Sequence, residues 1–140
     1  MIYRAAENTQ STFTTAVGTQ PQSILVVDDE PSFSAVLSEI LRSFGYLVLQ
    51  ANSVEHAIAI LEEDIPDLIL TDIMMPGIDG LSFVRRIQSE PLLSSIPTII
   101  VSAKHQPADI EAGVMAGADV YLIKPFSANE LREAVQSLLE

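Results

Sequence analysis

The stretch ILVVDDE, residues 24–30, joins a continuous run of apolar residues directly to a run of acidic ones. An apolar run without alternation is typical of a strand that is covered on both faces of a parallel sheet. Apolar residues then follow with helical spacing at Phe33, Val36, Leu37, Ile40, Leu41 and Phe44. Gly45 ends that pattern. The sequence therefore predicts a buried strand, a loop that carries carboxylates, and an amphipathic helix.

The same alternation of strand and helix continues to the C-terminus. Strands are expected at residues 46–50, 68–72, 98–102 and 120–123, with helices at 54–61, 81–88, 107–116 and 129–139. Asn52 or Ser53 begins the second helix, and Ser127 with Glu130 forms an S-x-x-E capping box at the last. Strict alternation with short connections predicts an α/β fold, a doubly wound five-stranded parallel sheet of flavodoxin-like order, (βα)5.

The chain divides into a polar N-terminal tail, residues 1–22, and a single domain, residues 23–140. Its 140 residues suit one domain of ordinary size, roughly 100–200 residues. The tail is rich in Thr, Gln, Asn and Ser, and its apolar residues are too scattered to form a helix or strand face. These apolar residues are Ile2, Tyr3, Phe13 and Val17. Residues 1–22 are therefore expected to be a tail or a linker.

The composition excludes several classes of function. A formal net charge of −12 disfavours direct binding to nucleic acid, because such binding depends on neutralising phosphates. The absence of cysteine removes disulfides, thiolate catalysis and cysteine-based zinc sites. No apolar run reaches the roughly 20 residues of a membrane-spanning helix. The N-terminus lacks the basic region followed by a continuous apolar stretch that is typical of a signal peptide. We expect a soluble, cytoplasmic protein that binds neither DNA nor membrane directly.

Polar residues stand at the carboxyl ends of the predicted strands, where ligands bind in such a sheet: Asp28, Asp29, Asp72, Ser102 and Lys124. Two carboxylates ~4 Å apart repel each other by about 4 kcal/mol at an effective dielectric near 20, so a cluster of three needs a cation. Oxygen ligands select a hard cation. Mg²⁺ fits, because it takes one or two carboxylates together with waters and phosphate oxygens. Asp29 and Asp72 are expected to bind it directly, and Asp28 partly through water.

The chain resembles the response-regulator receiver family of two-component signalling from Ser23 to Glu140. Four blocks carry the resemblance in the family's order and spacing: ILVVDDE at 24–30, LILTDIMMPGIDG at 68–80, IIVSA at 99–103 and GADVYLIKPF at 117–126. The resemblance implies a phosphorelay protein that takes a phosphoryl group from a histidine kinase or a phosphotransfer protein, with Mg²⁺ as cofactor. A downstream effector protein or output domain would read the modified state. Such a protein is an acceptor that loses the group slowly, not a turnover enzyme.

The resemblance also assigns roles to single residues at the strand ends. Asp72 would be the nucleophile that accepts the phosphoryl group, and Ser102 and Lys124 would hold the phosphoryl oxygens. Asp28 and Asp29 would be the acidic metal pair. The backbone carbonyl of the residue two positions after the acceptor, Met74, would be a further metal ligand.

Two implied roles concern conformation. Tyr121, three residues before Lys124, matches the aromatic switch residue of the family. Together with Ser102, it would move the face formed by the fourth helix, the fifth strand and the fifth helix when the domain is phosphorylated. The Lys124–Pro125 peptide bond would be cis, which aims the lysine ammonium into the site.

Other classes with a similar sheet fit less well. A haloacid-dehalogenase-like phosphatase needs a second aspartate two residues after its nucleophile, where this chain has Met74. A flavodoxin-type site needs a glycine- and hydroxyl-rich loop after the first strand, where this chain has residues 28–31, DDEP. A Rossmann site needs G-x-G-x-x-G, which is absent. Two possibilities stay open: an interaction module that keeps the fold without phosphorylation, and the receiver part of a longer transcription factor or hybrid kinase.

Overall fold

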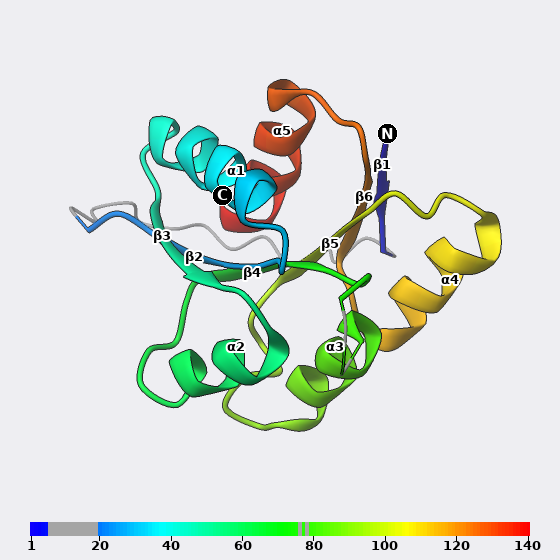
Figure 1. The fold of residues 1–140 in the computed structure, drawn as a ribbon, viewed down its shortest axis with the longest axis horizontal. Helices are drawn as coiled ribbons and strands as arrows, with labels where there is room; N and C mark the ends of the chain where they lie inside the picture. The colour runs from blue at the N-terminus through cyan, green and yellow to red at the C-terminus, as the bar shows by residue number, and fades with distance from the viewer. Residues whose placement is uncertain (6–19, 76, 78) are drawn as a thin grey trace.

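The structure is a computed structural model that describes residues 1–5, 20–75, 77 and 79–140. Figure 1 shows a single sheet with helices on both faces. The strands are β1 (Ile2–Arg4), β2 (Ser23–Val27), β3 (Leu47–Ala51), β4 (Leu68–Asp72), β5 (Thr98–Ser102) and β6 (Val120–Ile123). The helices are α1 (Pro31–Ser43), α2 (Val54–Leu61), α3 (Gly80–Ser89), α4 (Pro107–Ala116) and α5 (Ala128–Leu139). Within these described ranges, no helix has the length and apolar character needed to cross a membrane.

The strand order across the sheet is β1-β6-β5-β4-β2-β3. The five strands β2 to β6 run parallel, as the alternation of strands and helices predicts. The register pairs Leu25 with Ile69 across β2 and β4, and Asp72 with Val101 across β4 and β5. The predicted α/β fold with flavodoxin-like strand order is confirmed.

The core lies in two layers, one on each face of the sheet. Helices α1 and α5 cover one face, and α2, α3 and α4 cover the other (Figure 1). Ile24 and Val26 of β2 pack with α1 and α5, whereas Leu25 and Val27 pack with α2 and α3. All four side chains are fully buried. Burial on both faces is the reason that this strand reads as a continuous apolar run.

Polar side chains in the loops mark where the helices begin. Ser53 rather than Asn52 caps α2, because the Ser53 hydroxyl accepts the His56 N–H at 3.0 Å. Ser127 and Glu130 form the predicted capping box on α5. Such caps satisfy backbone N–H groups that have no partner inside the helix. They therefore set the points at which the loops leave the strand ends.

The sheet has a sixth strand, which the sequence analysis assigned to the polar tail. Residues 2–4 form β1, antiparallel to β6, so the sheet has one strand more than the five parallel strands predicted, and the prediction of no strand face at Ile2 and Tyr3 is wrong. A segment this short has no periodicity to read. Without β1, β6 would be an edge strand with open backbone groups, and Ile2 packs against the core layer of α1 and α5. Phe13 and Val17 lie outside the described residues.

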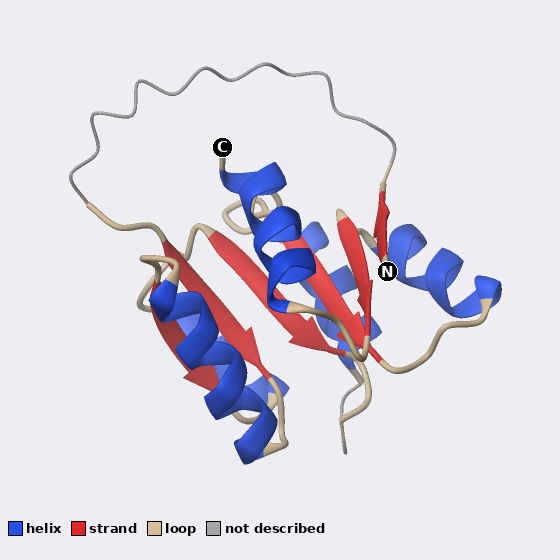
Figure 2. Ribbon diagram, turned by 90° about the horizontal axis from the view of Figure 1, so that it is seen from above, coloured by secondary structure: helices blue, strands red, loops and turns tan. Residues whose placement is uncertain are grey.

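Gln22 and Leu139 lie side by side. The Gln22 Nε2 group donates to the Leu139 carbonyl oxygen at 3.4 Å. Gln22 precedes β2 and Leu139 ends α5, so this contact lies at the amino ends of the parallel strands. Figure 2 shows the C-terminus at this side of the sheet.

Candidate functional site

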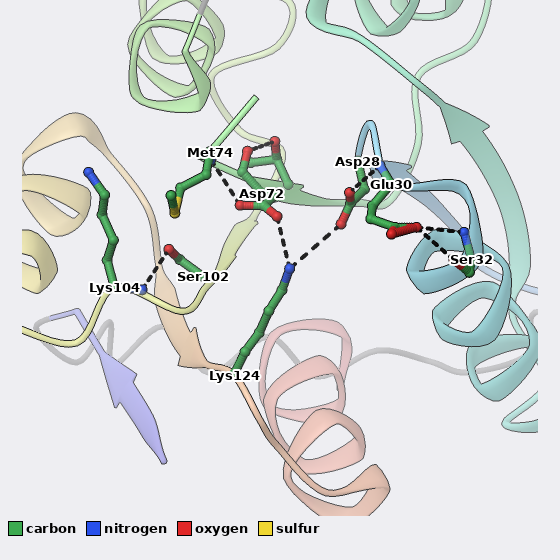
Figure 3. A network of polar contacts seen from close by, with 9 residues as sticks. Asp28, Glu30, Ser32, Asp72, Met74, Ser102, Lys104 and Lys124 are labelled. Carbon is green, nitrogen blue, oxygen red and sulfur yellow. Dashed lines mark hydrogen bonds and ion pairs between the residues drawn. The ribbon is translucent and has the colours of Figure 1, made fainter. Parts of the chain in front are cut away.

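The carboxyl ends of four parallel strands meet at one edge of the sheet, and polar side chains gather there (Figure 3). Asp28 follows β2, Asp72 ends β4, Ser102 ends β5 and Lys124 follows β6. These are strand-end residues that the sequence analysis selected. Asp29, which it also selected, has an exposed side chain at the rim of this group.

Asp72 is a buried carboxylate with a fixed orientation. Its exposed fraction is 7%. The Asp72 Oδ1 atom accepts the Met74 N–H at 2.9 Å, and Oδ2 accepts a hydrogen bond from the Lys124 ammonium at 2.9 Å. Buried charges require partners of this kind, and a hydrogen bond to an ionised group is stronger than one between neutral groups. The two contacts hold the carboxylate in one geometry, as a nucleophilic oxygen needs.

Lys124 lies between the two buried aspartates. Its Nζ atom is 2.9 Å from Asp72 Oδ2 and 3.9 Å from Asp28 Oδ2. The ring of Phe33, in the first turn of α1, has its centroid 4.0 Å from the same nitrogen. The ring face attracts a cation, so Phe33 helps to hold the ammonium in place. The Lys124–Pro125 peptide bond is cis, the isomer that the family resemblance implies.

Asp28 carries a charge that its surroundings compensate only in part. Its exposed fraction is 4%, and its Oδ1 atom accepts the Glu30 N–H at 2.8 Å. Burial raises the pKa of the Asp28 carboxyl above its usual value, and the negative charges of Asp72 and Asp29 also raise it. The Glu30 N–H and the Lys124 ammonium lower this pKa, but they do not cancel the effect of burial. A further positive charge near Asp28 would therefore be favourable.

The buried carboxylates of Asp28 and Asp72 suit a small hard cation. Among residues 1–5, 20–75, 77 and 79–140, no three Asp, Glu or His side chains converge closely enough to hold one ion. Two carboxylates are enough for Mg²⁺, which fills its remaining positions with waters and phosphate oxygens. Asp28 and Asp72 lie close enough together to supply two carboxylates, since the Lys124 ammonium lies within 3.9 Å of an oxygen of each. Asp28 and Asp72 are buried, whereas the neighbouring Asp29 is exposed.

The backbone of Lys104 connects Ser102 to Tyr121. Ser102 is fully buried, and its hydroxyl oxygen accepts the Lys104 N–H at 3.1 Å. Tyr121 is also fully buried, and its hydroxyl donates to the Lys104 carbonyl at 2.8 Å. Burial raises the pKa of Tyr121, and its contact with Ser102 offsets part of that rise. Since both side chains bond the same residue, movement of Ser102 would be transmitted to Tyr121.

The ring of Tyr121 fits inside the domain because residue 113 has no side chain. A Cβ atom on Gly113 would lie 2.8 Å from Tyr121 Cδ2 and 3.0 Å from Ile100 Cδ1. Gly113→Ala is therefore expected to displace the ring towards solvent, so that the pKa of Tyr121 falls towards the ordinary value of about 10. Titration of the Tyr121 ring signals by NMR measures this change. The expectation would be contradicted if the pKa of Tyr121 stayed the same and the free energy of unfolding rose by about 1 kcal/mol, which is the ordinary gain from replacing glycine by alanine in a helix.

Gly80 lets α3 begin directly against the end of β4. A Cβ atom on Gly80 would lie 2.3 Å from the Asp72 carbonyl oxygen and 2.4 Å from the Ile73 Cα atom. The Gly80 N–H donates to the Ile73 carbonyl at 3.3 Å. The backbone that follows Asp72 is thus pressed against the first turn of α3. This contact positions the loop that carries Met74.

Three residues of this site were not identified from the sequence as functional. Phe33 was assigned only to the apolar face of the first helix, and spacing gives no sign of a ring below an ammonium group. Gly80 and Gly113 were not distinguished from the other glycines. Gly113 did carry a usable signal, because a glycine inside a helix costs about 1 kcal/mol relative to alanine and indicates a close approach. Met74 lies beside Asp72 as expected, with its side chain 53% exposed.

Comparisons with known proteins agree with this geometry. Residues 24–136 match the response regulator receiver domain family. The phosphate regulon transcriptional regulatory protein PhoB of Pseudomonas aeruginosa is 36% identical over 118 residues, which are 84% of this chain and 52% of PhoB. The DNA-binding response regulator MtrA of Mycolicibacterium smegmatis is 36% identical over 121 residues, which are 86% of this chain and 52% of MtrA.

A solved structure shows the same fold. The receiver domain of the sensor histidine kinase PA1611 from Pseudomonas aeruginosa, with a magnesium ion in its active-site cleft, is 33% identical, with a TM-score of 0.79. The match covers 86% of this chain and 98% of that domain. The chain therefore belongs to the response regulator receiver domain family of two-component signalling. It spans about half the length of the curated relatives that it matches.

Proposed function

We propose that this chain accepts a phosphoryl group on Asp72 from a histidine kinase or a phosphotransfer protein, in a reaction that uses Mg²⁺. The observation that carries the proposal is the pair of contacts on the Asp72 carboxylate, the Met74 N–H on one oxygen and the Lys124 ammonium on the other. A fixed carboxylate can attack phosphorus, and the lysine can neutralise the charge of the group that arrives. Its proposed role is that of an acceptor of the phosphoryl group and not of a turnover enzyme.

The side chains around Asp72 have distinct proposed tasks during the transfer. Asp72 forms the new bond to phosphorus through one carboxylate oxygen. Lys124 then holds an oxygen of the phosphoryl group, because its ammonium already lies at hydrogen-bond distance from the carboxylate. The Ser102 hydroxyl, which accepts the Lys104 N–H, still has its own proton and can donate it to another phosphoryl oxygen.

The proposed metal ligands are Asp28, Asp29, Asp72 and the Met74 carbonyl. Asp29 and Asp72 would bind the ion directly, and the buried Asp28 would act partly through water. Bound there, Mg²⁺ would supply positive charge that stabilises the transferring group. The magnesium ion in the cleft of the PA1611 receiver domain supports this part of the proposal.

The proposed readout is a shift of the surface formed by α4, β6 and α5. Ser102 would move towards the phosphoryl group, and the shared Lys104 backbone would carry that movement to Tyr121. A downstream effector protein or output domain would bind the altered surface. The acidic charge of the chain argues against direct contact with nucleic acid by this domain. The expected location is the cytoplasm, as for the response regulators that the chain resembles.

An apolar hollow next to Lys124 is the proposed docking position of the phosphodonor. It has a volume of about 440 Å³ and is lined by Phe33, Val36, Leu37, Ile40, Ala103, Lys124, Pro125 and Phe126. Val36, which lines this hollow, is 58% exposed and so is available to contact a partner. A helix of the kinase or phosphotransfer protein that packs on α1 would bring its phosphohistidine to the open side of Asp72.

The decisive test of the proposed function is chemical phosphorylation of the isolated protein. With acetyl phosphate and Mg²⁺, we expect one base-labile phosphoryl group, located at Asp72 by mass spectrometry after borohydride reduction. Addition of EDTA before the donor should prevent labelling. A protein that stays unlabelled in the presence of Mg²⁺ would instead be an interaction module that keeps the fold without the chemistry.

Asp28→Asn is expected to remove stabilisation by Mg²⁺ while making the metal-free protein more stable. In the parent, Mg²⁺ at about 100 times its dissociation constant should add about 2.7 kcal/mol to the free energy of unfolding. The Asp28 pKa is raised in the folded state, so folding is favoured below the ordinary aspartate pKa and loses that advantage as the pH rises through the folded pKa. Asparagine does not ionise, so this loss of stability is absent in the variant. In EDTA, the free energy of unfolding of Asp28→Asn should exceed that of the parent at neutral pH, and the difference should vanish near pH 3.

Asp119→Asn is the matched control for that measurement. Asp119 lies at the amino end of β6, and burial raises its pKa although the Thr98 N–H donates to it at 2.9 Å. Its asparagine variant should show the same pH-dependent rise in Tm in EDTA and the full response to Mg²⁺. If Asp28→Asn kept the full response as well, Asp28 would not be a metal ligand.

A further inference from the structure

The outer edge of β6 is occupied by the first residues of the chain. β1 pairs antiparallel with β6, with Tyr3 opposite Tyr121. The pairing is bonded at both ends, because the Ile123 N–H donates to the Met1 carbonyl at 3.2 Å and the Ala5 N–H donates to the Asp119 carbonyl at 2.8 Å. Figure 1 shows β1 beside β6 in the space between α4 and α5. This is the surface that the proposed readout would move.

The register determines which groups of β1 face β6. Hydrogen-bonded pairs alternate with non-bonded pairs in an antiparallel ladder, and the bonds at both ends place Tyr3 and Tyr121 in the bonded class. The N–H of Arg4 therefore points away from β6. Side chains of directly opposed residues lie on the same face of a sheet with Cβ atoms about 4.5–5.5 Å apart, so Tyr3 lies next to Tyr121.

β1 is anchored on the other face as well. Ile2 has the opposite orientation to Tyr3 and packs against the core layer of α1 and α5. Tyr121 is fully buried, and its hydroxyl donates a hydrogen bond to the Lys104 carbonyl. The arrangement with Tyr121 inside is thus present together with a docked β1.

We propose that the outer edge of β6 is a strand-acceptor site, that its ligand is residues 2–4 of this chain, and that filling it stabilises the inward arrangement of Tyr121. This inference rests on the proposed function, since it assigns Tyr121 to the switch. In the proposed switch, a phosphoryl group at Asp72 draws Ser102 towards it and favours the same inward arrangement of Tyr121. Coupling between two sites is reciprocal. A docked β1 therefore strengthens binding of a phosphoryl group at Asp72, and a phosphoryl group at Asp72 strengthens docking of β1.

The length of the connection supports an occupant from the same chain. β1 and β2 are four strand positions apart in the sheet, which is about 19 Å at ~4.8 Å per strand. Residues 5–22 supply 18 residues, which could span about 60 Å when extended. The segment is long enough to reach its own β6 edge. A covalent connection of this kind gives an effective concentration on the order of millimolar, which favours the strand of the same chain over that of a second copy.

Two proline variants of the full chain test the inference. Tyr3→Pro removes an N–H that faces β6, whereas Arg4→Pro removes one that points away, and an edge strand tolerates proline in that position. Beryllofluoride with Mg²⁺ serves as the mimic of the phosphoryl group. Hydrogen exchange of the Ile123 amide reports docking, because this amide donates to Met1. NMR titration gives the affinity for beryllofluoride.

In Tyr3→Pro we expect Ile123 to exchange about tenfold faster and the affinity for beryllofluoride to fall about fivefold or more, while Arg4→Pro resembles the parent. In the parent, beryllofluoride should slow exchange of Ile123. Faster exchange in Tyr3→Pro with unchanged affinity would overturn the coupling. Rapid exchange of Ile123 in the parent, or protection that grows with protein concentration, would overturn the intramolecular site. If no variant bound beryllofluoride while Ile123 stayed protected, the proposed function would fail and the coupling with it, but the docked strand would stand.

Discussion

Asp72→Asn is expected to abolish phosphoryl transfer to the protein, with a loss on the order of a thousandfold or more. Removal of a nucleophile has effects of this size, because positioning and charge stabilisation cannot replace the missing bond. The amide has nearly the shape of the carboxylate, and its oxygen can still accept the Met74 N–H. The variant should therefore fold normally. The measurement is incorporation of label from radioactive acetyl phosphate in the presence of Mg²⁺.

Asp67→Asn is the control for this experiment. Asp67 precedes β4 and Asp72 ends it, so the two residues lie at opposite ends of one strand. The Asp67 carboxylate accepts the Ser23 N–H at 2.7 Å, so this control also alters a hydrogen-bonded aspartate. It should be labelled at the parental rate. Full labelling of Asp72→Asn would refute the assignment of the acceptor.

Gly80→Ala is expected to destabilise the domain strongly. The new Cβ would have to displace backbone, the Asp72 carbonyl at 2.3 Å and the Ile73 Cα at 2.4 Å, and backbone yields less easily than the end of a side chain. We expect a loss of about 3 kcal/mol, at the upper end for overpacking. For a domain of this size, that corresponds to a fall in Tm of about 10 °C. Labelling at Asp72 should slow as well, because the loop that follows the acceptor must move.

Gly45→Ala separates this clash from the general cost of replacing glycine. Gly45 has a φ of +99°, and a Cβ atom there would meet nothing within 4 Å. Its cost is backbone strain alone, about 1 kcal/mol. Thermal unfolding of the two variants gives the comparison. If Gly80→Ala were no less stable than Gly45→Ala, the close approach of α3 to β4 would be unimportant.

The parallel part of the fold could be predicted because each element has a strong local pattern. The apolar run of residues 24–27 matches a strand with both faces covered, and the helical spacing before Gly45 gives α1. The acidic and polar strand ends could also be located, since the carboxyl ends of parallel strands always share an edge. The sequence alone therefore places Asp28, Asp72 and Lys124 at one edge of the sheet.

The features that escaped prediction depend on contacts between segments far apart in the chain. β1 is too short for periodicity, and its place is determined by the open edge of β6. The helical pattern assigns Phe33 to a buried face without revealing the ammonium of Lys124 above it. Asp28 and Asp29 look equivalent in sequence, but in the structure the side chain of Asp28 is buried and that of Asp29 is exposed.

The hydrogen bond between Gln22 and Leu139 means that the polypeptide enters and leaves the parallel-sheet domain at almost the same point. A domain with this property can be inserted into a loop of an unrelated host, or circularly permuted, without stretching either junction. Asp72 and Lys124 lie at the opposite ends of the strands, so a graft at that point leaves them accessible. The two junctions to a host protein and the candidate site therefore lie at opposite ends of the parallel strands.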